Sequence, residues 1–80
     1  MKKSNTIKIE KYQDAFDLIS VPYNDKAKFH IKQLEQEGYK EKNICYAIWK
    51  SQDKLLQYKN DDRFWGIFIN EIRKIAFKNN

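Results

Sequence analysis

The sequence predicts an all-α fold, a compact four-helix domain formed by one chain of 80 residues. Two observations favour this fold class. The chain contains only one proline and two glycines, and its apolar residues recur three and four positions apart, which is the spacing of one face of a helix. A third observation concerns the core, because five Phe, five Tyr and two Trp supply enough apolar surface for a domain this small.

The first predicted helix spans about residues 9–19. Pro22 follows it and ends it, because the residue before a proline disfavours helical geometry. The apolar stripe of this helix consists of Ile9, Tyr12, Ala15, Phe16 and Ile19. Ile7 and Ile9 also alternate with polar neighbours, which leaves a short N-terminal strand as the alternative.

The second predicted helix begins after Asn24, whose side chain suits an N-cap position. It ends at Gly38, since glycine readily adopts the left-handed conformation found just past a helix. Its stripe consists of Ala27, Ile31 and Leu34, with His30 at the edge.

Two longer helices are predicted over residues 40–58 and 62–78, and their apolar arcs are wide enough to contact neighbours on two sides. The first arc comprises Ile44, Cys45, Ala47, Ile48, Trp49, Ser51, Leu55 and Leu56, and the second comprises Phe64, Trp65, Ile67, Phe68, Ile69, Ile72, Ile75 and Ala76. Asp61 and Asp62 are expected to cap the last helix. Gly66 within it weakens the helix by about 1 kcal/mol relative to alanine. We expect these two helices to form the hub, with the first two packed across them.

Few side chains in the sequence suit catalysis. Cys45 and His30 are the single cysteine and histidine, so they cannot complete a common zinc ligand set. They are the one candidate pair of nucleophile and base, but Cys45 lies on the shoulder of an apolar arc and His30 at the edge of another, which favours a structural role. Glu71 falls at the rim of an apolar arc, where an ion pair with Lys74 is expected from their spacing. The sequence therefore predicts no catalytic, cofactor-binding or metal-binding residue, and a protein that is not an enzyme.

The chain is expected to be one soluble, cytoplasmic domain over residues 1–80, frayed at residues 1–6 and 79–80. A single cysteine suits a reducing compartment. No apolar run approaches the roughly 20 residues that cross a bilayer, and the polar residues after Met1 do not resemble a signal peptide.

The charge distribution favours an anionic partner for the C-terminal half. The net charge is +5, and from Tyr39 onward nine Lys and Arg face five Asp and Glu. Three rings also fall outside the core stripes, namely Phe29, Tyr46 and Phe77, each beside cationic side chains. Such rings can stack on bases while cations meet phosphates, serve a protein interface, or be covered by the chain itself. The basic balance also suits solubility alone.

Residues 28–50 have the outline of a helix-turn-helix motif, in which the second helix offers its exposed face to the major groove of DNA. That face carries Lys42, Asn43, Tyr46 and Lys50. Two details count against the motif: the second helix is long, and polar Gln33 and Glu37 lie near the turn, where packing residues are expected.

Our leading hypothesis is a nucleic-acid-binding accessory domain without catalytic activity, with DNA favoured over RNA. The expected contact residues are Lys40, Lys42, Asn43, Tyr46, Lys50, Arg73 and Lys74. The alternative is a protein-binding adaptor or inhibitor of viral or mobile-element type. It would act through Phe29 and Phe77 on a larger protein, or on a second copy in a homodimer. Neither hypothesis requires a cofactor or a membrane.

Overall fold

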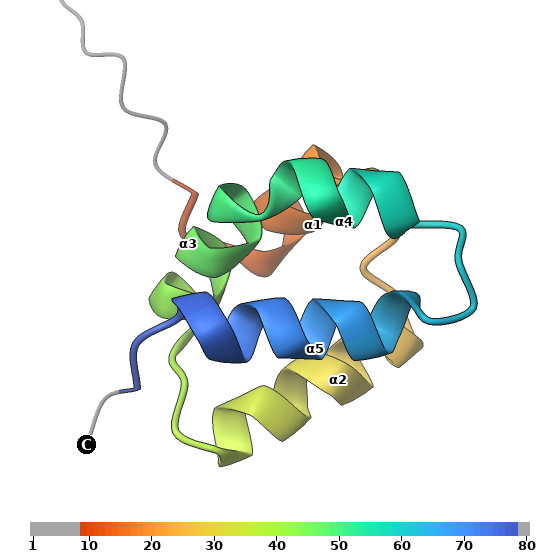
Figure 1. The fold of residues 1–80 in the computed structure, drawn as a ribbon. Helices are drawn as coiled ribbons and strands as arrows, with labels where there is room; N and C mark the ends of the chain where they lie inside the picture. The colour runs from red at the N-terminus through yellow and green to blue at the C-terminus, as the bar shows by residue number, and fades with distance from the viewer. Residues whose placement is uncertain (1–8, 79–80) are drawn as a thin grey trace, which may run out of the picture.

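The computed structural model describes residues 9–78, which form five α-helices and confirm the all-α prediction. The helices are α1 (Tyr12–Leu18), α2 (Asp25–Gln36), α3 (Glu41–Lys50), α4 (Gln52–Tyr58) and α5 (Phe64–Ile75). In Figure 1, α5 crosses the middle of the molecule with α2 below it, α3 and α4 above it, and α1 behind them. α3 packs on α1, α4 and α5, whereas α2 packs on α5. The two helices of the helix-turn-helix outline therefore share α5 as a packing partner.

The core is filled by large side chains from all five helices. Its fully buried members include Phe16, Ile19, Leu34, Ile44, Ile48, Leu55, Phe68 and Ile72. The Phe16 ring lies 5.5 Å from the ring of Phe68 and 5.3 Å from that of Tyr23. Each such side chain contributes roughly 1.5–3 kcal/mol by leaving water, so the predicted apolar stripes are the surfaces that hold the helices together.

The predicted count of four helices is wrong, because the helix expected over residues 40–58 is divided at Ser51. The Ser51 hydroxyl donates a hydrogen bond of 2.7 Å to the carbonyl oxygen of Ala47. A serine that bonds back to the preceding turn bends a helix, and here the backbone of Ser51 departs from helical geometry, with ψ near 15°. The helix continues as α4 from Gln52, so α4 runs in a different direction from α3.

The first helix begins at Tyr12, later than the sequence pattern indicates. The backbone N–H of Tyr12 donates to the carboxylate of Glu41, 3.1 Å away in the first turn of α3. A distant side chain thus satisfies a free N–H at the start of α1, an arrangement that local periodicity does not encode. Ile9 lies outside any helix or strand, and Ile7 and the two ends expected to fray lie outside the described residues.

The signals at the ends of α2 are confirmed. Asn24 caps α2, since its side-chain oxygen accepts the N–H of Ala27 at 3.1 Å. Gly38 follows the helix with φ of +108°, a conformation that side chains disfavour.

The expected capping of α5 by aspartates is wrong. Arg63 is the N-cap residue and makes no side-chain capping bond. The Asp61 carboxylate instead accepts the backbone N–H of Arg63 at 2.8 Å, within the turn that precedes the helix. No helix in residues 9–78 is long and apolar enough to cross a membrane.

Candidate functional site

The outward face of α3 exposes two neighbouring aromatic rings between two lysines. The opposite face of this helix is buried against α1 and α5. This exposed face carries Lys42, Tyr46, Trp49 and Lys50. Lys42, Tyr46 and Lys50 are spaced four residues apart, and Trp49 is three residues from Tyr46, which makes them neighbours on the helix. We call these four residues the α3 surface.

The two rings of the α3 surface are half-exposed and adjacent. Tyr46 retains 43% of its accessible surface and Trp49 retains 38%. Their ring centroids are 6.0 Å apart, and the two ring planes are tilted by 43° to each other. The Lys50 ammonium lies 5.9 Å from the centroid of the Trp49 ring, within cation–π range. The exposure predicted for Tyr46 is confirmed.

Trp49 is the residue that sequence reasoning missed. Its place on the shoulder of the apolar arc assigned it to the core, yet more than a third of its surface faces solvent. Its spacing of three residues from Tyr46 was the available signal, because residues three apart on a helix are neighbours.

The lysines around the α3 surface are not neutralised by carboxylates. Among residues 9–78, Lys40, Lys42 and Lys50 take part in no ion pair. Glu41, which lies between Lys40 and Lys42 in the sequence, directs its carboxylate to the N–H of Tyr12. The positive charge at this end of the molecule is therefore available to an anionic partner.

The C-terminal segment is fastened beside the first turn of α3. The Asn43 side-chain amide donates to the carbonyl oxygen of Phe77 at 3.0 Å, and Lys78 pairs with Tyr39 in an isolated antiparallel bridge. The Lys78 ammonium also lies 5.4 Å from the centroid of the Tyr39 ring. Asn43, predicted to contact nucleic acid, thus makes a structural bond to the backbone of Phe77, a residue that is itself 70% exposed.

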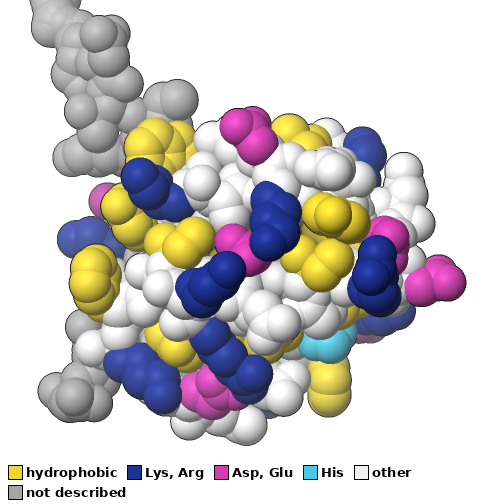
Figure 2. Space-filling view, viewed as in Figure 1, with side chains coloured by type: hydrophobic (Ala, Val, Ile, Leu, Met, Phe, Trp, Pro, Cys, Tyr) yellow, Lys and Arg dark blue, Asp and Glu magenta, His cyan; other side chains and the backbone are white. Residues whose placement is uncertain are grey.

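The two predicted contact residues on α5 are both ion-paired. Arg73 binds the Glu37 carboxylate through two nitrogens, with Nε 3.0 Å from Oε1. This hydrogen bond lowers the pKa of Glu37, an effect that burial partly opposes. Lys74 lies 3.3 Å from Oε2 of Glu71, as the spacing predicts. Figure 2 shows the result, since basic and acidic side chains are interleaved over α4 and α5.

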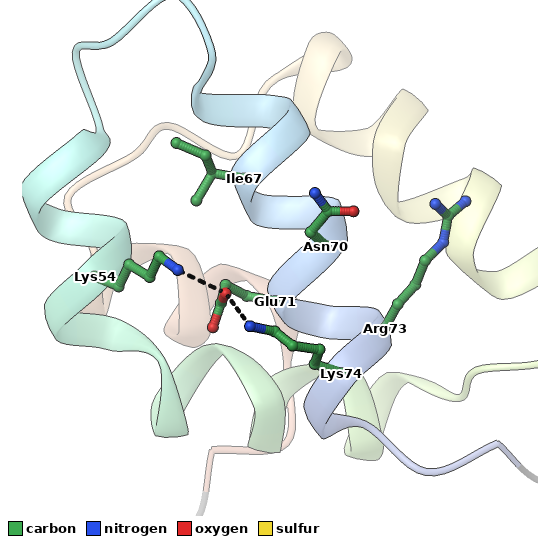
Figure 3. Close-up of a pocket in the computed structure, with 6 residues that line it drawn as sticks. All are labelled: Lys54, Ile67, Asn70, Glu71, Arg73 and Lys74. Carbon is green, nitrogen blue, oxygen red and sulfur yellow. Dashed lines mark hydrogen bonds and ion pairs between the residues drawn. The ribbon is translucent and has the colours of Figure 1, made fainter.

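Glu71 has a second partner that the sequence did not reveal. Lys54, on α4, donates to the same Oε2 atom at 3.0 Å (Figure 3). The hydrogen bond from Lys54 and, after the opposing effect of burial, the one from Lys74 hold the pKa of Glu71 below its ordinary value. The structure therefore separates the predicted set into an unpaired group on α3 and a paired group on α5.

Phe29 lies apart from both groups, on α2. Its ring is 66% exposed, as predicted from its position off the core stripe. It meets the His30 ring edge-on at 5.3 Å, and His30 stacks on Trp65 at 4.5 Å. Phe29 therefore belongs to a different part of the surface from Tyr46 and Trp49.

Cys45 is a core residue, as its place on an apolar arc indicates. It is fully buried, and burial raises the pKa of its thiol to about 12. A thiol held protonated in this way is a poor nucleophile and a poor metal ligand. Residues 9–78 bring together no cluster of three His, Cys, Asp or Glu side chains suited to a metal ion.

Comparisons with known proteins leave the function to be argued from this surface. No protein-family model matches the chain, and no solved structure matches it. A UPF0329 protein of Encephalitozoon cuniculi (strain GB-M1) is 40% identical over 45 residues, which cover 55% of this chain and 28% of that protein. The chain thus matches less than a third of the length of this similar protein, whose name states no activity.

Proposed function

We propose that this domain binds nucleic acid through the α3 surface, with the Phe77 ring beside it. The supporting observation is the pair of half-exposed rings, Tyr46 and Trp49, set beside lysines that no carboxylate neutralises within the described residues. Lysines that meet phosphates release condensed counterions, which drives association. Exposed rings add stacking on bases, worth roughly 1–3 kcal/mol per base in single strands.

DNA is the favoured form of nucleic acid in this proposal. α3 is held from behind by α1 and α5 and presents its free face to solvent. The major groove of B-form DNA admits an α-helix, whereas the major groove of A-form RNA is too deep and narrow for side chains to read. The proposal includes no catalytic step, and a reducing cytoplasmic setting is consistent with the single thiol.

Fluorescence anisotropy with labelled duplex DNA, single-stranded DNA and RNA at low salt tests the proposal. We expect binding that weakens as salt rises, and a loss of affinity of about tenfold or more for the double variant Lys42→Gln/Lys50→Gln, which removes two phosphate partners. The matched control is Lys26→Gln/Lys59→Gln, which removes the same charge outside the α3 surface. Absence of binding to every probe, or equal losses in both double variants, contradicts the proposal.

A second candidate function is protein binding, as an adaptor or through self-association. It is favoured by the large exposure of Phe29 (66%) and Phe77 (70%), which exceeds that of the rings on α3. Exposed rings are common in protein interfaces. Sedimentation velocity over a range of protein concentrations distinguishes the homodimer form of this function. It predicts a concentration-dependent dimer that Phe29→Ser/Phe77→Ser abolishes and Lys42→Gln/Lys50→Gln leaves intact.

A further inference from the structure

A hollow between α4 and α5 gathers more positive charge than its single carboxylate neutralises. Its volume is about 470 Å³, and its lining consists of Lys54, Ile67, Asn70, Glu71, Arg73 and Lys74. Figure 3 shows Lys54 reaching from α4 and Lys74 from α5 toward Glu71, while Arg73 extends away toward α2. The hollow therefore has two ammonium groups at one end and polar side chains along its side.

Within residues 9–78, the arrangement around Glu71 leaves most of the ammonium donors without a protein acceptor. Both ammonium groups approach the same oxygen, Oε2, at 3.0 Å from Lys54 and 3.3 Å from Lys74. Each ammonium has three N–H donors, and one carboxylate oxygen cannot satisfy them all. The two like charges are also brought close to each other, which is unfavourable unless more negative charge is supplied.

Exposure shows where a second anion would fit. The side chain of Glu71 retains only 11% of its accessible surface, whereas Lys54 and Lys74 retain 47% and 67%. The carboxylate thus lies beneath the ammonium groups, and their remaining donors face the solvent side. Asn70 is exposed on the same rim and carries two further amide donors.

We propose that this hollow binds a phosphate group, which bridges the ammonium groups of Lys54 and Lys74. Phosphate oxygens form charge-assisted hydrogen bonds with lysine, and a second negative charge would neutralise the cluster. A nucleic-acid backbone or a free phosphate compound can supply the same group. The first source rests on the proposed function, because it would extend the contact from the α3 surface to α4 and α5.

Amide chemical shifts measured by NMR during titration with inorganic phosphate test the site directly, with chloride at equal ionic strength as the reference. We expect saturable shifts at Asn70 and Glu71 that chloride does not cause. Affinity should fall about tenfold or more in Lys54→Gln/Lys74→Gln, because each lost ammonium removes a charge-assisted hydrogen bond. Lys26→Gln/Lys59→Gln is the control of equal charge and should bind phosphate as the wild type does.

One further variant separates binding from folding. Lys54→Gln/Lys74→Gln leaves the Glu71 carboxylate without its partners, which destabilises the chain. Lys54→Gln/Glu71→Gln/Lys74→Gln removes all three charges and keeps the side chains close to their original lengths. Its spectrum reports whether the fold is retained, and a folded triple variant that still binds phosphate with wild-type affinity overturns the proposal.

An oligonucleotide titration at several salt concentrations distinguishes the two sources. If Lys54→Gln/Lys74→Gln reduces the slope of log K against log salt by about 1 for each lost phosphate contact, the group belongs to the nucleic-acid backbone. Phosphate binding with an unchanged slope, or with no DNA binding at all, identifies a free phosphate compound and leaves the site intact even if the α3 proposal fails. No phosphate-specific shifts together with an unchanged slope overturn the site, whatever the α3 surface binds.

Discussion

The outward face of α3 and the exposed side of α5 carry similar residue types, yet their charges are in different states. On α3, Lys42 and Lys50 have no ion-pair partner in the described part of the chain, and they lie beside exposed rings. On α5, Arg73 is held by Glu37 and Lys74 by Glu71. A cation with a carboxylate of its own, such as Arg73, gains less from a phosphate because it must give that partner up, whereas Lys54 and Lys74 share the single carboxylate of Glu71. The contribution of a lysine or arginine to binding affinity therefore depends on which residues lie opposite it and not on its residue type.

The largest effect is expected from the rings that distinguish the α3 surface. Tyr46→Leu/Trp49→Leu keeps apolar, helix-favouring side chains but removes the stacking faces, at roughly 1–3 kcal/mol of binding free energy per stacked base. We therefore expect affinity for single-stranded DNA to fall at least tenfold in an anisotropy titration, with less effect on the salt dependence, because both lysines remain.

Phe29→Leu is the matched control for the two ring substitutions. It removes a ring with 66% exposure on α2, and we expect unchanged affinity. Equal losses of affinity in Phe29→Leu and in the double variant would mean that the α3 rings have no special role. Urea unfolding of all three proteins separates a loss of binding from a loss of structure.

The features of the fold that could be predicted from the sequence are those determined by residues within one or two helical turns of each other. The cap at Asn24, the left-handed Gly38 and the exposure of Tyr46 follow from residue type and helical spacing. The bend at Ser51 does not, because serine is also compatible with a helix interior, and only its bond to the Ala47 carbonyl shows the bend. Local patterns therefore give the helices but not where a long one is divided.

The candidate site was harder to predict, because its charge state depends on contacts between distant positions. Lys54 and Glu71 are 17 residues apart, and Glu37 and Arg73 are 36 apart. No spacing rule for a single helix relates such pairs, whereas the pair Glu71 and Lys74 obeys one and was predicted. The unpaired state of the α3 lysines is equally a property of the packed chain.

The next largest effect is a loss of stability in acid that originates on the α5 side. The pKa of Glu71 is below its ordinary value of 4.5 in the folded chain, so the unfolded chain takes up the proton first as the pH falls. The ion pairs of Glu71 therefore stabilise the fold fully above about pH 4.5, and this contribution is lost as the pH falls through the lower, folded pKa. Urea unfolding between pH 6 and pH 3 should show the decline.

Substituting Glu71 checks the origin of this pH dependence. Glu71→Gln should lower the free energy of unfolding at pH 7 by about 2 kcal/mol, through the loss of hydrogen bonds from charged groups. It should also flatten the acid decline. Glu10→Gln removes an exposed carboxylate outside every ion pair of residues 9–78 and should change neither quantity. An unaltered acid decline in Glu71→Gln would place its origin at another group.

The smallest effect comes from converting a paired cation of α5 into an unpaired one. Glu37→Gln releases Arg73, whose side chain is 44% exposed in the ion pair. The cost in stability should be small, since both side chains of this ion pair are partly solvated. If ion pairing is what keeps Arg73 from a nucleic acid, DNA affinity should rise and the slope of log K against log salt should steepen by about 1.

The control is Asp61→Asn, which releases Arg63 in the same way at the start of α5 and adds the same net charge. If DNA affinity rises only in Glu37→Gln, Arg73 contacts the nucleic acid directly. If affinity rises equally in both variants, the effect comes from overall charge, and ion pairing does not explain the difference between α3 and α5.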